Sequence, residues 1–160
     1  MDRNQLQRQV ALMRSSLIEQ VPNPSLPSLK LLVGYLDEQQ FLQLEDLQDD
    51  VNPNFVEEIV TLFYKDSARL FHNIEQALKS RPVDFAKLDN YMHQFRGSTS
   101  SIGAIKVKNE CNQFKEFCLA GNAEGCARAF QKVKQEHETL RTQLETYFKL
   151  RRQAGLAETV

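Results

Sequence analysis

Hydrophobic residues recur at helical spacing along most of this chain. In its middle they alternate three and four residues apart, at Phe85, Leu88, Met92, Phe95, Thr99 and Ile102. A second long stripe follows, at Cys126, Phe130, Val133, His137, Leu140, Leu144 and Tyr147. Such stripes are typical of amphipathic helices that turn one face towards a core. The pattern predicts helix throughout and no strand.

Capping and breaking residues divide this pattern into separate helices. Asn52 and Pro53 predict an N-cap and first helical position. The helix they open would end near Ser80, before Pro82, and turn these residues inward: Phe55, Ile59, Leu62, Phe63, Leu70, Ile74 and Leu78. A break around Gly103 precedes a helix that Gly121 closes, with Val107, Cys111, Phe114 and Cys118 on its apolar face. We therefore predict an all-α fold, an antiparallel four-helix bundle with additional N-terminal helices packed across it.

The N-terminal region interrupts the helical pattern once. Residues 1–20 predict a helix, but residues 21–33 contain Pro22, Pro24 and Pro27. Proline lacks an N–H and disfavours helical geometry in the residue before it, so we predict an irregular loop there. With 160 residues, of which 41% are hydrophobic, the chain suits one core. We predict a single domain over residues 1–160, with the bundle at 34–152 and a flexible tail at 153–160.

His93 lies one residue past Met92, and about 100° of helical rotation per residue turns it off the buried stripe towards solvent. Its neighbours one turn away are Asp89, Asn90, Arg96 and Gly97. The missing side chain of Gly97 would leave space for a bulky group or a partner's backbone to approach the imidazole. This placement suggests a reactive histidine.

The residues after His93 disfavour a helix. Glycine costs roughly 1 kcal/mol relative to alanine, and the Ser and Thr residues at 98–101 add about 0.5 kcal/mol each. Something must compensate if the helix continues. The alternative is a helix that ends near Phe95, with His93 merely exposed before a loop.

The other two histidines are weaker candidates for a reactive group. His72 lies beside the apolar stripe of its predicted helix, without a suitably placed glycine or cation. His137 falls on the apolar stripe of the last helix, where a core or boundary histidine is the usual outcome.

Composition and motifs exclude several classes of function. The formal net charge of −1 argues against nucleic-acid binding, and the cluster Lys149, Arg151 and Arg152 suits a helix C-terminus. Neither a membrane-spanning run nor a signal peptide is present, so we expect a cytosolic protein without membrane insertion. The chain also lacks a Gly-rich phosphate loop and a magnesium-binding acidic cluster. The three cysteines match neither a zinc site nor a disulfide framework and are expected to be buried free thiols.

The segment His-Gln-Phe-Arg-Gly-Ser-Thr-Ser-Ser-Ile-Gly at 93–103 resembles the motif of plant histidine-containing phosphotransfer proteins, with Arg96 in place of the usual lysine and Thr99 in place of the second serine. Residues 43–56, 107–111 and 148–150 also resemble segments of that family. The resemblance covers the first 20 residues and the chain from Tyr35 onwards. Residues 21–33 form an insertion relative to its pattern.

This resemblance implies a phosphorelay intermediate. His93 would accept a phosphoryl group from the receiver aspartate of a hybrid sensor kinase and pass it to response regulators, in cytokinin signalling between cytosol and nucleus. Arg96 would take the role of the family's lysine and stabilise the group in transfer. The resemblance implies no cofactor and no autonomous kinase activity, because the magnesium belongs to the partner's receiver domain. We expect a monomer.

The same resemblance indicates a docking surface beside the active helix. Gln94, Phe41 and Leu42 are the candidates, and core packing is the alternative role for Phe41 and Leu42. The family also contains members that lack the histidine and inhibit by occupying receivers. His93 argues against that class here, but a receiver-binding adaptor with little or no phosphotransfer remains the alternative function.

Overall fold

The computed structural model describes residues 3–18 and 35–158 of the chain. These residues form six helices and no strand. The helices are α1 (Arg3–Ile18), α2 (Glu38–Asp46), α3 (Phe55–Lys79), α4 (Phe85–Ile102), α5 (Ile105–Leu119) and α6 (Ala123–Glu158). The all-α class is confirmed.

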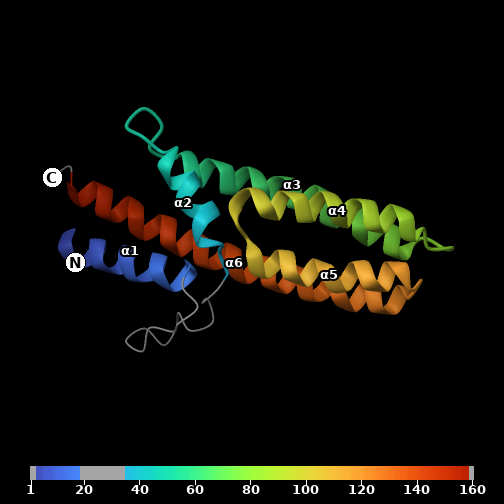
Figure 1. Cartoon of the computed structure of the whole chain (residues 1–160). Coiled ribbons are helices and arrows are strands. Elements are labelled where there is room, and N and C mark those ends of the chain that lie inside the picture. Colours follow the sequence, from blue (N-terminus) through green and yellow to red (C-terminus); the bar gives the residue numbers. More distant parts are fainter. Residues whose placement is uncertain (1–2, 19–34, 159–160) are drawn as a thin grey trace.

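The helices form an antiparallel bundle with two additions. Figure 1 shows α3, α4, α5 and the first half of α6 lying side by side, while α6 continues along the whole molecule. Successive helices of the bundle pack against each other, and α6 also contacts α3. The helix α1 packs along α6, and α2 contacts both α3 and α4. This arrangement confirms the predicted four-helix bundle with additional N-terminal helices.

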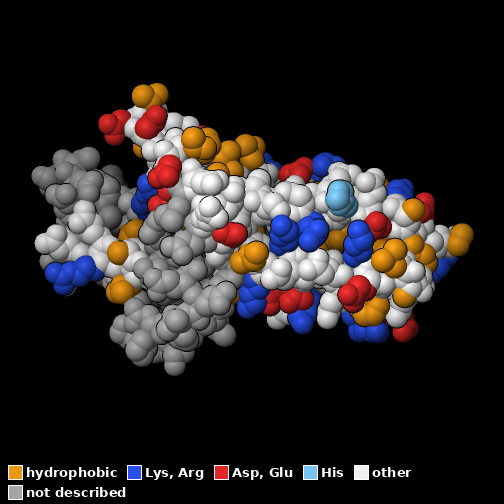
Figure 2. All heavy atoms as spheres, viewed as in Figure 1, with side chains coloured by type: hydrophobic (Ala, Val, Ile, Leu, Met, Phe, Trp, Pro, Cys, Tyr) orange, Lys and Arg blue, Asp and Glu red, His pale blue; other side chains and the backbone are white. Residues whose placement is uncertain are grey.

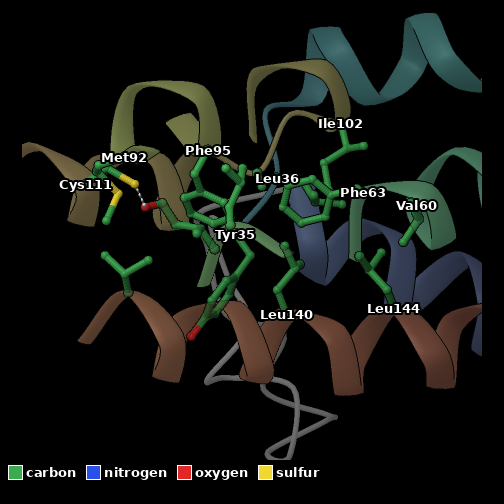
Figure 3. Close-up of a cluster of buried hydrophobic side chains, with 14 of the residues drawn as sticks. Tyr35, Leu36, Val60, Phe63, Met92, Phe95, Ile102, Cys111, Leu140 and Leu144 are labelled. Carbon is green, nitrogen blue, oxygen red and sulfur yellow. Dashed lines mark hydrogen bonds between the residues drawn. The ribbon is translucent and has the colours of Figure 1, made fainter. Parts of the chain in front are cut away.

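The core follows the stripes that the sequence predicted for α4, α5 and α6. All seven predicted positions of α6 are buried, and in α4 only Phe85 stays partly exposed. Figure 3 shows side chains from several helices meeting in this core, with Phe63 and Phe95 among them. In α3 the prediction for Leu62 is wrong, because its side chain is 59% exposed. Phe63, Leu70 and Ile74 are buried as predicted, and the buried stripe of α3 is completed by Val56, Val60, Ser67 and Ala77.

Several predicted boundaries also shift. The helix α3 begins at Phe55 with Asn54 as its N-cap, rather than at Pro53, because Asp49 Oδ1 accepts from Asn52 N (2.7 Å) and holds a turn there. Its end at Lys79 agrees with the prediction. The helix α6 runs to Glu158, past the predicted end of the bundle at residue 152. The proline-containing segment 21–33 lies outside the described residues.

The segment before α2 is tied both to α6 and to the turn between α4 and α5. Tyr35 Oη donates to Glu136 Oε2 of α6 (2.6 Å), and Asp37 N donates to Gly103 O (2.7 Å). The Asp37 side chain caps α2 by accepting from its first backbone N–H groups. Gly103 has φ +71°, and a Cβ there would lie 3.2 Å from Asp37 O. These contacts hold α2 against the end of α4.

The turn between α5 and α6 is tightly packed. Gly121 has φ +65°, and Asn122 Oδ1 accepts from Gly125 N (2.9 Å) at the start of α6. A Cβ on Gly125 would lie 2.2 Å from the ring of Phe117. The Sγ atoms of Cys118 and Cys126 are 3.7 Å apart, and the three cysteines are buried free thiols, as predicted.

His137 is a buried histidine surrounded by aromatic rings. It is 7% exposed, and its nearest ring partners are Tyr64 and Phe71, with centroids at 4.5 and 4.7 Å. Its Nε2 has no hydrogen-bond partner. Burial, assisted by the charge of Arg141, lowers the pKa of His137 from 6.5 to about 4. The imidazole is therefore a neutral core group at neutral pH, which confirms the core role over the reactive one.

We expect His137→Phe to flatten the loss of stability in mild acid. In the wild type the unfolded state gains the His137 proton near pH 6.5 and the folded state only near pH 4. The free energy of unfolding therefore falls by up to about 3 kcal/mol across that window because of this residue alone. Urea unfolding at several pH values measures the difference between the two proteins.

The control is His72→Gln, which removes an exposed histidine of α3 and should keep the wild-type pH dependence. Curves for wild type and His137→Phe that run parallel from pH 7 to 4 would contradict the prediction.

Candidate functional site

The helix that carries His93 continues without interruption to Ile102, so the alternative of a loop after Phe95 is wrong. Asp84 Oδ1 caps its start by accepting from Lys87 N (3.1 Å), and Gly103 ends it in the left-handed conformation. Between these caps, burial of Thr99 and Ile102 compensates for the poor helix formers.

Local hydrogen bonds also accommodate the serine and threonine residues. Ser98 Oγ donates to Gln94 O (3.2 Å), Thr99 Oγ1 to Arg96 O (2.5 Å) and Ser101 Oγ to Ser98 O (2.6 Å). Each of these hydroxyls therefore has an acceptor within the helix, so it does not draw the backbone into a non-helical conformation. The helix remains regular where its propensity is lowest, directly after His93.

His93 lies on the exposed face of α4, together with Gln94, Arg96 and Gly97. A Cβ placed on Gly97 would meet nothing within 4 Å, so the surface beside the imidazole is open. Figure 2 shows a histidine side chain standing on this face of the molecule, with lysine and arginine side chains close by. The predicted site residues His93, Arg96 and Gly97 are thus brought together on one accessible surface.

The other side of this surface is formed by α5. The charge of Arg96 acts on Cys111, lowering the pKa of a thiol that burial raises to about 12. Asp89, among smaller effects, adds to the burial that raises the pKa of Cys118. Ser100 lies two turns along α4 from His93, and it lines one hollow of about 220 Å³ together with Lys108 of α5. The seam between α4 and α5 therefore runs past His93.

The site residues predicted from the sequence include none from α5. Lys108, Asn112 and Lys115 follow one another on its outer side at spacings of four and three. That spacing is visible in the sequence, but it does not reveal which neighbouring helix those residues face.

The structure corrects the docking role expected for Phe41. This side chain is 1% exposed and packs edge-on against Tyr147, with ring centroids 6.2 Å apart. Its role is core packing, the alternative considered above, because a side chain so buried offers no contact surface. Leu42 belongs to α2, but its side chain is outside the described part of the chain. Gln94 is exposed and stays available for contact.

The remaining candidates form no second site among the described residues. His72 is exposed on α3, where its charge acts on Glu75. Within 3–18 and 35–158, no three histidine, cysteine or acidic side chains converge as they would around a metal ion. In the same part of the chain no helix has the length and apolar character needed to cross a membrane.

The exposed imidazole determines what this site can do. A neutral imidazole is a nucleophile, and an adjacent cation can stabilise negative charge on the group that it receives. The imidazole stands on a surface that is open over Gly97, which suits a reactive group delivered by another macromolecule.

Comparison with known proteins agrees with this geometry. Residues 58–147 match the family model described as the Hpt domain. Histidine-containing phosphotransfer protein 4 of Arabidopsis thaliana is 64% identical over 119 residues, which cover 74% of this chain and 93% of that protein. Pseudo histidine-containing phosphotransfer protein 5 of rice is 54% identical over 159 residues, covering 99% and 95%. The rice match therefore spans positions 21–33 as well.

Solved structures show the same architecture. The histidine-containing phosphotransfer protein MtHPt2 from Medicago truncatula superposes with a TM-score of 0.79 at 39% identity, covering 95% of this chain and 94% of that chain. The corresponding maize protein, ZmHP2, gives a TM-score of 0.75 at 37% identity, covering 92% and 98%.

We expect Gly97→Ala to stabilise the folded protein by about 1 kcal/mol. Alanine is the better helix former by that amount, and its Cβ would meet no neighbouring atom. Thermal or urea unfolding measures the change. Gly125→Ala is the matched control at a crowded helical position and should destabilise, because its Cβ would collide with Phe117. A loss of stability in Gly97→Ala would show that Gly97 is required for folding.

Proposed function

Because this chain belongs to the Hpt-domain family of histidine-containing phosphotransfer proteins, we propose that it is an active carrier that receives and returns a phosphoryl group at His93. Proteins of this family carry phosphoryl groups in two-component phosphorelays and interact with receiver domains. The observation that carries the proposal is the exposed His93 on an uninterrupted helix, with Arg96 one turn away and open space over Gly97.

For the transfer, this chain supplies only the nucleophile and the surface that positions it. A His93 ring nitrogen attacks the phosphorus of a receiver's aspartyl phosphate, the N–P bond forms, and the P–O bond to the aspartate carboxylate breaks. The same steps in reverse hand the group to the aspartate of a second receiver. Magnesium would be held by the receiver, and this protein would supply no autonomous kinase activity.

Arg96 and Gly97 take distinct roles in this proposal. The Arg96 guanidinium, on the same face as His93, would balance the charge of the phosphoryl oxygens. Gly97 would let the receiver's active-site edge approach the imidazole, so its cost in helix stability serves access rather than folding. Gln94 would contact the docked receiver from the other flank of His93.

The physiological setting follows from the family resemblance. We place this carrier between hybrid sensor kinases and response regulators, in cytokinin signalling, with traffic between cytosol and nucleus. The plant relatives that are named histidine-containing phosphotransfer proteins support the phosphorelay part of this setting.

A receiver-binding adaptor is the second candidate function. Three rice relatives carry the name pseudo histidine-containing phosphotransfer protein, and two of them match nearly the full chain. Such a protein would occupy receivers without carrying phosphate. The presence of His93 on the open face of α4 favours the carrier.

We expect phosphoryl uptake at His93 alone. Wild type incubated with a phosphorylated receiver domain and magnesium should gain acid-labile, base-stable label, and His93→Gln should gain none while still binding the receiver. His72→Gln, which removes the other exposed histidine, should label as wild type does. Absence of label on wild type with receiver binding intact would establish the adaptor instead.

Charge at position 96 should set the rate of transfer. We expect Arg96→Lys to stay within about threefold of wild type and Arg96→Gln to transfer about tenfold more slowly, because an exposed cation stabilises the phosphoryl oxygens less than a buried one would. Rapid-quench measurement of label transfer, with receiver concentration varied, separates the maximal rate from docking. An unchanged maximal rate in Arg96→Gln would remove Arg96 from the chemistry.

A further inference from the structure

The helices α4 and α5 run antiparallel, and a hollow that they share indicates their register. Ser100 of α4 and Lys108 of α5 line the same hollow. Moving seven residues back along α4 leads to His93, and moving seven residues forward along α5 leads to Lys115. Seven residues are two turns, a rise of about 10.5 Å in each helix, so His93 and Lys115 are opposed as Ser100 and Lys108 are.

Electrostatic effects on the buried thiols give the same register. Arg96 acts on Cys111, and Asp89, seven residues earlier in α4, acts on Cys118, seven residues later in α5. His93 lies between Asp89 and Arg96, so its level on α5 falls between the two cysteines. Lys115 lies in that interval.

The side of α5 that faces α4 follows from the contacts of its other side. Lys106 pairs with Glu136 and Glu110 with Lys132, and a Cβ on Gly125 would touch Phe117, so positions 106, 110 and 117 face α6. The buried stripe through Cys111, Phe114 and Cys118 comes next around the helix. Positions 108, 112 and 115 lie beyond that stripe, on the side of α4.

The cations along this seam have no ion-pair partners among the described residues. Lys106 of α5 pairs with Glu136 of α6, and Lys132 of α6 pairs with Glu110 of α5. By contrast, Arg96, Lys108 and Lys115 take part in no ion pair within residues 3–18 and 35–158. Figure 2 shows lysine and arginine side chains gathered along the boundary of α4 and α5 beside a histidine. Their charges are free to meet an anion at His93.

We propose that Lys115 is a second phosphoryl-binding cation of the His93 site, reaching across the seam from α5 while Arg96 acts from α4. The inference rests on the proposed carrier function. A phosphoryl group on His93 carries close to two negative charges, and Asp89, one turn before His93, adds a like charge nearby. Lys115 offsets that repulsion and holds the group between two cations on different helices.

The test uses phosphoramidate, a small donor that phosphorylates histidine without receiver docking, together with a phosphorylated receiver domain. In Lys115→Gln, ³¹P NMR titration should show a higher pKa for the phosphoryl group on His93 than in wild type, because a nearby cation favours the dianion. Uptake from the receiver should slow about threefold to tenfold, as expected for one exposed cation. Lys115→Arg should restore both values.

Lys65→Gln is the matched control, since Lys65 is an exposed lysine of α3 that lines a hollow with Arg141 and Leu144 of α6. It makes the same change in net charge and should leave both the phosphoryl pKa and the uptake rate unchanged. A Lys115→Gln protein that matches Lys65→Gln in both measurements overturns the role of Lys115 while leaving the carrier intact. Wild type that takes label from neither donor overturns the carrier function itself.

Discussion

The burial of one face of α4 is the constraint on which the site depends. Phe95, Thr99 and Ile102 lie in the core, and their packing keeps the helix regular through a glycine and a run of hydroxyl residues. Without that packing, local propensity would end the helix close to His93. The outer face is thereby free to combine a nucleophile, a cation and an open position at fixed helical spacing.

The rest of the fold supports α4 from two directions. On one side α2 is held against the end of α4 by the hydrogen bond from Asp37 N to Gly103 O, and Tyr35 ties the same segment to Glu136 of α6. On the other side α5 packs along α4, and Ser100 and Lys108 line one hollow at their boundary. Rigid helices on both flanks suit a site whose partner must find the imidazole quickly and leave again.

The site contrasts with the buried aromatic cluster around His137. His137 lies among aromatic rings and stays neutral because burial lowers its pKa, so its imidazole serves packing. His93 has the same chemical group on a solvent-facing position beside unpaired cations of the described chain. The difference between the exposed and the core histidine is therefore made by position alone.

Much of this protein could be predicted from the sequence. Apolar residues alternately three and four positions apart identified the buried faces of α4, α5 and α6, because helical periodicity is a local property of the chain. It also placed His93, Arg96 and Gly97 together, since all three lie on one helix. The motif at 93–103 then supplied the family.

Only the tertiary structure decided how the helices face one another. Two adjacent stripes compete on α3, and packing against the neighbouring helices buried Val56 and Val60 and left Leu62 exposed. The same packing buried Phe41, which a single apolar position in a short helix could not reveal. It also set Lys115 opposite His93, because the register between two antiparallel helices depends on side chains that are distant in sequence.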